Sequence, residues 1–291
     1  MRARKLFKRT LLSIAVVLTL TAALSYWMFK GTPEFYRPAQ LTPEQRATVS
    51  ERADDKVAET ISWVALLKAD EDRRTHAQRA GSTHPVTRAA SSYTVSFTQD
   101  ELNVFFDKWS QLNGWSSRLE QYVKDSAIVL RKDRLILAGT LADVGAVGSF
   151  HFEPAIDEKG QLQLTLQRVL AGRLPMPELV WTAQRNRLLA SVRARLPAWQ
   201  RRANIAPTGA ANNEAVAAGM GKLLLDVLHR RPGEPVIFLR TTDATVPVRL
   251  TDIRVAEGEV TLTVESMTSD ERAALLDRIR EPETAVTAAV R

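Results

Sequence analysis

The sequence has no cysteine and only four histidines among its 291 residues. The missing cysteine excludes a disulfide framework, a thiolate metal site and a cysteine nucleophile. The histidines stand at positions 76, 84, 151 and 229, and no two of them have the spacing of a metal-binding pair.

Two common motifs of enzymes are also missing. Residues 145–149 (GAVGS) do not form the G-x-S-x-G elbow of a serine hydrolase. Residues 219–222 (GMGK) lack both the upstream spacing and the Ser or Thr of a phosphate-binding loop. The sequence therefore predicts no catalytic residue, no metal site and no cofactor, and we expect a protein without enzymatic activity.

Basic residues are concentrated at the N-terminus. The formal net charge is +7, and Arg2, Arg4, Lys5, Lys8 and Arg9 supply +5 of it, which leaves +2 for residues 10–291. So small a charge on the main part of the chain gives little electrostatic attraction for a polyanion. We therefore expect no nucleic-acid partner.

The sequence has one long apolar run, residues 11–29, which contains no charged residue. As a helix it would be about 28 Å long, close to the thickness of the bilayer hydrocarbon. Tyr26 and Trp27 lie at its end, where aromatic rings favour the headgroup region, and Lys30 follows. The alternative is a cleaved signal peptide, with Thr21 and Ala23 as the small residues before the cut. We favour an uncleaved anchor, because the run is long and ends in bulky residues.

The five N-terminal cations, which no acidic residue accompanies, place the N-terminus in the cytoplasm. The sequence thus predicts a single-pass protein of the inner (cytoplasmic) membrane with an extracytoplasmic main domain. The predicted divisions are a cytoplasmic stub at 1–9, an anchor at 10–29, a juxtamembrane helix and linker at 30–92, a main domain at 93–268, and a short helix and tail at 269–291.

The juxtamembrane region begins with residues 31–38 (GTPEFYRP), which we expect to be a short extended segment. Thr42, followed by Pro43 and by Gln45, is typical of a capped helix start. An apolar stripe predicts an amphipathic helix to about residue 71, either packed on the main domain or forming a stalk or dimer coil. Residues 72–92 are polar and are interpreted as a linker.

The main domain is predicted to be α+β. We expect an antiparallel meander, because the turns between consecutive strands are too short for crossover helices. In the strand at 161–170, leucines alternate with polar residues, and Phe150 and Phe152 flank His151, so His151 is expected on the wet face. In the strand at 246–255 the apolar phase shifts, which predicts a bulge or a sharp bend. The predicted strands are 93–97, 126–130, 134–141, 146–154, 161–170, 236–240, 246–255 and 260–266, and the predicted helices begin at Thr98, Glu178, Glu214 and Thr268.

Arginines are concentrated in the helix predicted at 178–202. No acidic residue lies between Leu179 and Asn213. This helix could lie on anionic lipid headgroups, with a tryptophan at the interface, or it could present an ordinary solvated face. The candidate membrane-surface contacts are Arg185, Arg187, Arg193, Arg195, Trp199, Arg201 and Arg202.

The chain from Tyr93 to Ser266 resembles a known family in its strand pattern. The strand 148–154 (GSFHFEP), a Lys-Gly turn, the strand 162–170 and residues 172–177 (GRLPMP) are similar to the YpmS-like bacterial single-anchor membrane proteins. The segment Phe97-Thr98-x-x-Glu101-Leu102-Asn103 resembles that family's helix after the first strand. A wider similarity is to tubular lipid-binding (TULIP-like) and LmeA-like phospholipid-binding domains. The resemblance implies a curved sheet around a long helix, and it implies no catalytic residue.

These observations favour an apolar groove between sheet and helix that binds a membrane lipid or an acyl chain. Gly139 and Gly148 would leave room in it or permit curvature. The alternative is an envelope scaffold with a filled core that binds a protein partner, and an envelope hydrolase has the least support. The candidate groove residues are Leu135, Leu137, Leu141, Phe150, Phe152, Leu162, Leu164 and Leu166.

Overall fold

The computed structural model describes residues 19, 23–38, 40–79, 91–112, 120–203, 213–240 and 245–280. The predicted anchor lies mostly outside these residues, and only its end is described, with residues 23–30 helical. Within the described ranges, no helix combines the length and the apolar character needed to cross a bilayer.

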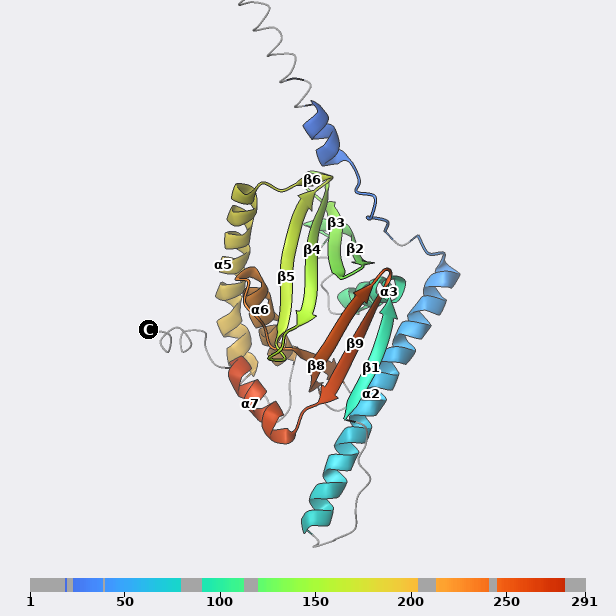
Figure 1. Ribbon diagram of the computed structural model, residues 1–291, viewed down its shortest axis with the longest axis vertical. Helices are drawn as coiled ribbons and strands as arrows, with labels where there is room; N and C mark the ends of the chain where they lie inside the picture. The colour runs from blue at the N-terminus through green and yellow to red at the C-terminus, as the bar shows by residue number, and fades with distance from the viewer. Residues whose placement is uncertain are drawn as a thin grey trace, which may run out of the picture.

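The first sheet is a five-stranded antiparallel meander (Figure 1). Its strands are β2 (Val123–Arg131), β3 (Arg134–Leu141), β4 (Val147–Ile156), β5 (Leu162–Ala171) and the short β6 (Leu174–Pro175), which lie in chain order. Three of these strands coincide closely with the predicted ones, because their turn signals and apolar alternation agree. Strand β2 begins three residues earlier than expected, and a register shift between Lys124 and Ala127 interrupts its pairing with β3.

The second sheet has the strand order β1-β9-β8-β7. It joins β1 (Ser92–Thr98) to β7 (Val236–Arg240), β8 (Thr245–Ala256) and β9 (Glu259–Ser266). We expected one meander, and the structure differs because β1 pairs with β9 along its whole length. The predicted bulge in β8 is confirmed by a register shift between Leu250 and Asp252.

Two groups of helices cover the sheets on opposite sides of the molecule (Figure 1). On one side lie α2 (Pro43–Arg79) and α3 (Gln99–Leu112), and on the other lie α5 (Glu178–Ala203), α6 (Asn213–Leu228) and α7 (Ser269–Arg280). Helix α2 has 37 residues and is therefore about 55 Å long. Residues 72–79, which we interpreted as linker, are its last two turns, while residues 80–90 lie outside the described residues.

Helix α2 packs on the domain, as the first of the two interpretations expected. Its Ala53, Trp63 and Val64 are buried, and the Trp63 ring stacks on Tyr93 of β1 with ring centroids 5.5 Å apart. Burial of this stripe explains why the helix forms despite many charged residues on its other face.

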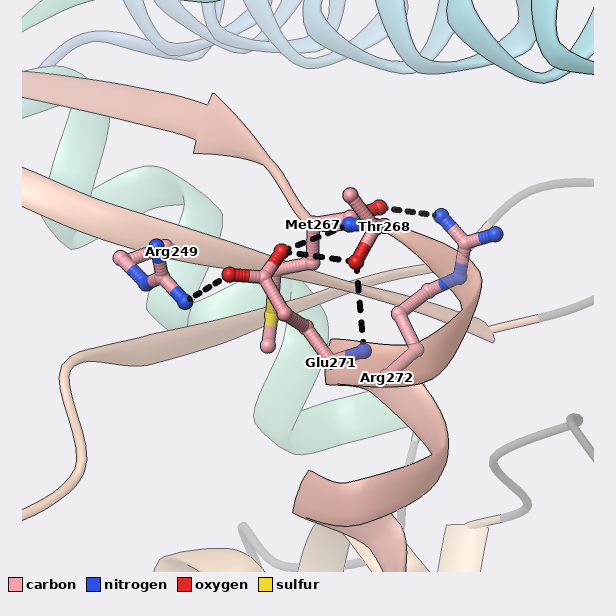
Figure 2. Close-up of polar contacts among 5 residues, drawn as sticks. All are labelled: Arg249, Met267, Thr268, Glu271 and Arg272. Carbon is pink, nitrogen blue, oxygen red and sulfur yellow. Dashed lines mark hydrogen bonds and ion pairs between the residues drawn. The ribbon is translucent and has the colours of Figure 1, made fainter.

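Capping boxes begin three of the helices, each at the predicted Thr. Thr42 and Gln45 start α2, Thr98 and Glu101 start α3, and in each pair the side chain of one residue bonds the backbone N–H of the other. Figure 2 shows the third box, before α7, where Glu271 accepts hydrogen bonds from the Thr268 N–H at 2.8 Å and from Arg249 at 2.8 Å. The Thr268 N–H first, and then Arg249, lower the pKa of Glu271 to about 2.

An apolar cluster binds α5, α6 and α7 to the first sheet. Leu189 and Leu196 of α5, Leu225 of α6 and Leu275 of α7 are buried in it, and Phe150 and Leu166 of the sheet pack against it. Two of the eight side chains that we expected to line a groove, Phe150 and Leu166, therefore pack against the three helices instead.

Candidate functional site

The eight candidate groove residues share one face of the five-stranded sheet, which we call the groove face. Leu135 and Leu137 lie opposite Phe152 and Phe150, and Phe152 lies opposite Leu166. Leu162 and Leu164 alternate with exposed glutamine and threonine along β5, and Leu141 continues the alternation of β3. Since side chains opposite each other across a ladder point to the same side, the register brings all eight together on one surface.

Burial differs along the groove face. Leu162 is buried with Trp63 and Val248 in the cluster between the two sheets, and Leu164 packs beside it. Leu135 packs against Leu130 of β2 in a separate cluster at the junction of the sheets with α3.

The middle of the groove face is the least covered part. Leu141 and Phe152 are only half-buried, and Leu137 is 41% exposed in the interior of the sheet. Leu137 lies directly opposite Phe150, whose ring is half-buried against Trp181 of α5 at 5.8 Å. An exposed leucine beside half-buried aromatic rings forms an apolar surface next to the edge of the helix layer.

The opposite face of the same sheet is covered by the segment that follows the predicted anchor. Tyr36 is buried against Val129, Ile136 and Val147, and its hydroxyl donates a hydrogen bond to the backbone oxygen of Asp125 at 2.6 Å. Burial is the main cause that raises the pKa of Tyr36. Pro33 and Tyr36 of this segment are thus buried, and the aromatic pair Phe35-Tyr36 was the sequence signal that could have indicated it.

His151 lies on this covered face, so the prediction that it faces water is wrong. Its side chain is 6% exposed, with the Phe35 ring edge-on at 5.1 Å and the Ser149 hydroxyl 3.2 Å from Nε2. Burial first, and then the charges of Arg134 and Arg168, lower the pKa of His151. The alternation placed the side chain on the correct face, but the sequence did not show that residues 35 and 36 cover this face.

The end of the helix at 23–30 contacts the turn between β5 and β6. The N–H of Arg173 donates to the Met28 carbonyl oxygen at 2.9 Å, and its guanidinium lies 5.5 Å from the centre of the Trp27 ring. Gly172 has a φ of 61°, and a Cβ there would lie 2.1 Å from the Phe29 carbonyl oxygen. Only glycine permits this close approach, and we expected no such role for it.

The two glycines of the groove face differ from our expectation. A Cβ on Gly139 would lie 2.2 Å from Cγ1 of Val123, so this glycine lets the bulged start of β2 approach and leaves no free room. At Gly148 a Cβ would lie 3.2 Å from the nearest Leu141 side-chain carbon, and that side chain can rotate. Gly148 is therefore the position at which a larger side chain would narrow the groove face.

The arginines of α5 do not form one surface. Arg185 and Arg193 line a cleft of about 440 Å³ between α5 and the end of α6, together with Glu178 and Arg230. Arg187 and Arg195 are exposed and are not among the residues that line it. The side chains of Trp199, Arg201 and Arg202 lie outside the described part of the chain. The predicted lipid-surface contacts are thus divided between a cleft and the solvent-exposed surface.

Among the described residues, no group of three or more histidine, aspartate or glutamate side chains could hold a metal ion. Neither a family model, a curated protein nor a solved structure matches the chain. The candidate site therefore depends on geometry and on the pattern of the residues themselves.

Proposed function

We propose that the protein is a membrane-anchored, extracytoplasmic and non-enzymatic protein that binds an acyl chain of a membrane lipid on the groove face. The observation that carries the proposal is the exposure of Leu137 in the middle of the sheet, beside half-buried Phe150 and Phe152. Exposed apolar surface is costly at about 25 cal/mol per Å², and an acyl chain laid along these side chains would remove it from water.

The asymmetry of the two sheet faces supports this proposal. The covered face is closed by Tyr36, whereas the groove face has closed clusters at both ends and a half-exposed middle. A long apolar ligand fits such a surface, because β3 and β4 are each paired with a neighbouring strand on both sides. In the proposed arrangement the sheet curves around the helix layer, as in the TULIP-like domains that the sequence resembles.

The apolar run at residues 11–29 supports the proposed anchor, and the basic residues before it support a cytoplasmic N-terminus. The anchor supplies the reason to name a membrane lipid as ligand, since it keeps the groove face near the bilayer.

A photo-crosslinking experiment tests the proposal. The full-length chain is placed in nanodiscs that contain a phospholipid with a diazirine on its acyl chain, and the labelled peptides are identified by mass spectrometry. We expect labels on β3 and β4, and we expect Leu137→Glu and Gly148→Val to reduce them several-fold. Leu66→Glu is the matched control, since Leu66 is an exposed leucine of α2 and is not one of the eight groove-face residues. Equal labelling of Leu137→Glu and the unaltered chain would refute the proposal.

The alternative function is that of an envelope scaffold that binds a protein partner. It is favoured by one observation, the closed packing of Leu162 and Leu164 between the two sheets. Absence of any label on β3 and β4 would support this alternative.

A further inference from the structure

Two turns of the first sheet are bonded to the end of the helix at 23–30. The Arg173 N–H of the β5–β6 turn donates to the Met28 carbonyl oxygen at 2.9 Å, and the Lys30 ammonium donates to the Val144 carbonyl oxygen of the β3–β4 turn. Both turns therefore lie at the end of the sheet that faces this helix (Figure 1). We call this part of the molecule the helix-proximal end.

Large apolar side chains are exposed at the helix-proximal end. Val144 is exposed in the β3–β4 turn, and Tyr122, directly before β2, is 70% exposed. The Tyr122 carbonyl oxygen accepts a hydrogen bond from the Ala142 N–H at 2.9 Å, so the start of β2 lies beside that turn. Helix α5 also begins at this end (Figure 1), and Leu179 and Val180 in its first turn are exposed, Leu179 to 84%. Three separate elements thus present apolar side chains at the same end of the domain.

The exposed aromatic residues of the helix indicate what covers this end. Tyr26 and Trp27 are exposed, and rings that combine an apolar body with a polar group favour the headgroup region of a bilayer. The Arg173 guanidinium lies 5.5 Å from the centre of the Trp27 ring, so the β5–β6 turn lies beside this aromatic pair. With residues 11–29 in the bilayer, the helix-proximal end would therefore lie at the membrane surface.

Charge gives no comparable explanation, because the helix-proximal end carries both signs. Lys30 and Arg173 are exposed there, and so are Asp143 and Glu178. Apolar surface next to a bilayer leaves water when it enters the interfacial region, and this favourable transfer does not require an anionic lipid. The helix-proximal end therefore fits the interface of a bilayer, including one made of zwitterionic lipids.

We propose that the helix-proximal end docks on the bilayer, with Tyr122, Val144 and Leu179 inserted among the lipid headgroups. The proposal rests on the membrane anchor of the proposed function, and it adds a second attachment that is made by the domain itself. Leu141 and Gly148 of the groove face lie at the ends of β3 and β4 that adjoin the β3–β4 turn. Docking would therefore bring the groove face next to the lipid.

Site-directed spin labelling of the full-length chain in phosphatidylcholine nanodiscs tests the proposal. The chain has no cysteine, so Tyr122→Cys, Val144→Cys and Leu179→Cys each carry a single nitroxide without removal of a native thiol. The collision rate of each label is measured with oxygen, which concentrates in the bilayer, and with a water-soluble nickel chelate. Lys159→Cys is the matched control, since Lys159 is exposed in the β4–β5 turn at the opposite end of the same sheet (Figure 1). Relative to this control, we expect the three labels to collide several-fold less with the nickel chelate and more with oxygen.

A second measurement separates docking from mere proximity to the anchor. Tyr122→Glu/Leu179→Glu, combined with the label at position 144, should raise the collision rate with the nickel chelate, because carboxylates are costly to place in the interface. Both side chains are exposed, so we expect the fold to be kept. An unchanged rate would overturn the proposal, since the anchor alone would then determine the depth of the label.

A label at Ser13→Cys, inside the apolar run, reports the anchor separately. Labels at positions 122, 144 and 179 that collide with the nickel chelate as freely as the control, together with a lipid-embedded label at position 13, would overturn docking and leave the anchor intact. A water-exposed label at position 13 would refute the anchor, and this proposal with it.

Discussion

Two lysine–carboxylate pairs join α2 to α3, and they provide a test of how the long helix is held. Lys56 donates to Glu101 at 2.7 Å, and Lys108 donates to Asp54 at 2.6 Å. The Glu101 side chain is 4% exposed, whereas both side chains of the second pair are 48% exposed. The two pairs thus have similar chemistry and join the same helices, but they differ in burial.

We predict that Lys56→Met destabilises the fold by about 2–3 kcal/mol. Removing one partner of a fully buried ion pair costs about 3–5 kcal/mol. The cost here is smaller, because Lys56 is itself 31% exposed and because the Thr98 N–H still donates to Glu101 at 2.8 Å. For Lys108→Met we predict about 0.5 kcal/mol, the usual contribution of an exposed pair.

The pH dependence gives a second measurement of the same pair. Burial raises the pKa of Glu101, but hydrogen bonds from Lys56 and from the Thr98 N–H outweigh it and leave the pKa below its usual value. The stability that Glu101 contributes is therefore fully present above the pKa of the unfolded chain, and it is lost as the pH falls through the lower folded pKa. In Lys56→Met the burial effect prevails and raises the pKa of Glu101 in the folded state, so protonation of Glu101 favours the folded state. We therefore expect the stability difference between Lys56→Met and the unaltered chain to shrink as the pH falls.

Urea titration of the full-length chain in a mild detergent, followed by tryptophan fluorescence, measures both quantities. The double variant Lys56→Met/Glu101→Gln should recover about 1 kcal/mol relative to Lys56→Met, because a neutral amide is less costly to bury than an unpaired carboxylate. If Lys56→Met and Lys108→Met cost the same, or if the double variant recovers nothing, the reasoning from burial is refuted.

Two further predictions concern the two faces of the first sheet. Leu164→Asp should cost about 3 kcal/mol, because it places a carboxylate in an apolar cluster, while Gln163→Asp on the exposed side should cost about 0.5 kcal/mol or less. Equal midpoints in a urea titration would mean that the face assignment of β5 is wrong. Tyr36→Phe should cost about 1 kcal/mol, through the lost hydrogen bond to Asp125, whereas Tyr36→Ala should cost about 3–5 kcal/mol. Thermal unfolding that distinguishes neither Tyr36 variant from the unaltered chain would contradict the packing of Tyr36 in the core.

The local structure was largely predictable because it depends on neighbours in the sequence. The box Thr98–Glu101 and the hairpin at Glu257-Gly258 are short patterns with a single geometric solution, and both occur where they were expected. The phase shift in β8 likewise predicted its bulge, since a change of face requires an extra residue.

Long-range pairing was not predictable from the same patterns. The alternation of β1 fits any antiparallel partner, and only the folded chain shows that it selects β9. The groove face and the cleft between α5 and α6 differ in the same way. The groove face depends on the order of β3, β4 and β5, which could be inferred from the short turns between them. The cleft around Arg185 and Arg193 could not be inferred, since Arg230 reaches it from a turn 37 residues beyond Arg193.

The contacts of residues 27–36 with the first sheet connect the helix at 23–30 directly to the domain. A domain that follows a membrane span through a flexible linker can rotate freely and sample a range of heights above the bilayer. Here the chain leaves the helix at 23–30, bonds the β5–β6 turn through Met28 and enters the core at Tyr36 (Figure 1). With the proposed anchor in place, the helix at 23–30 and the first sheet would move as one rigid body. The groove face would then keep a constant orientation and distance relative to the bilayer. A lipid or a partner protein would therefore have to reach the domain at the membrane surface.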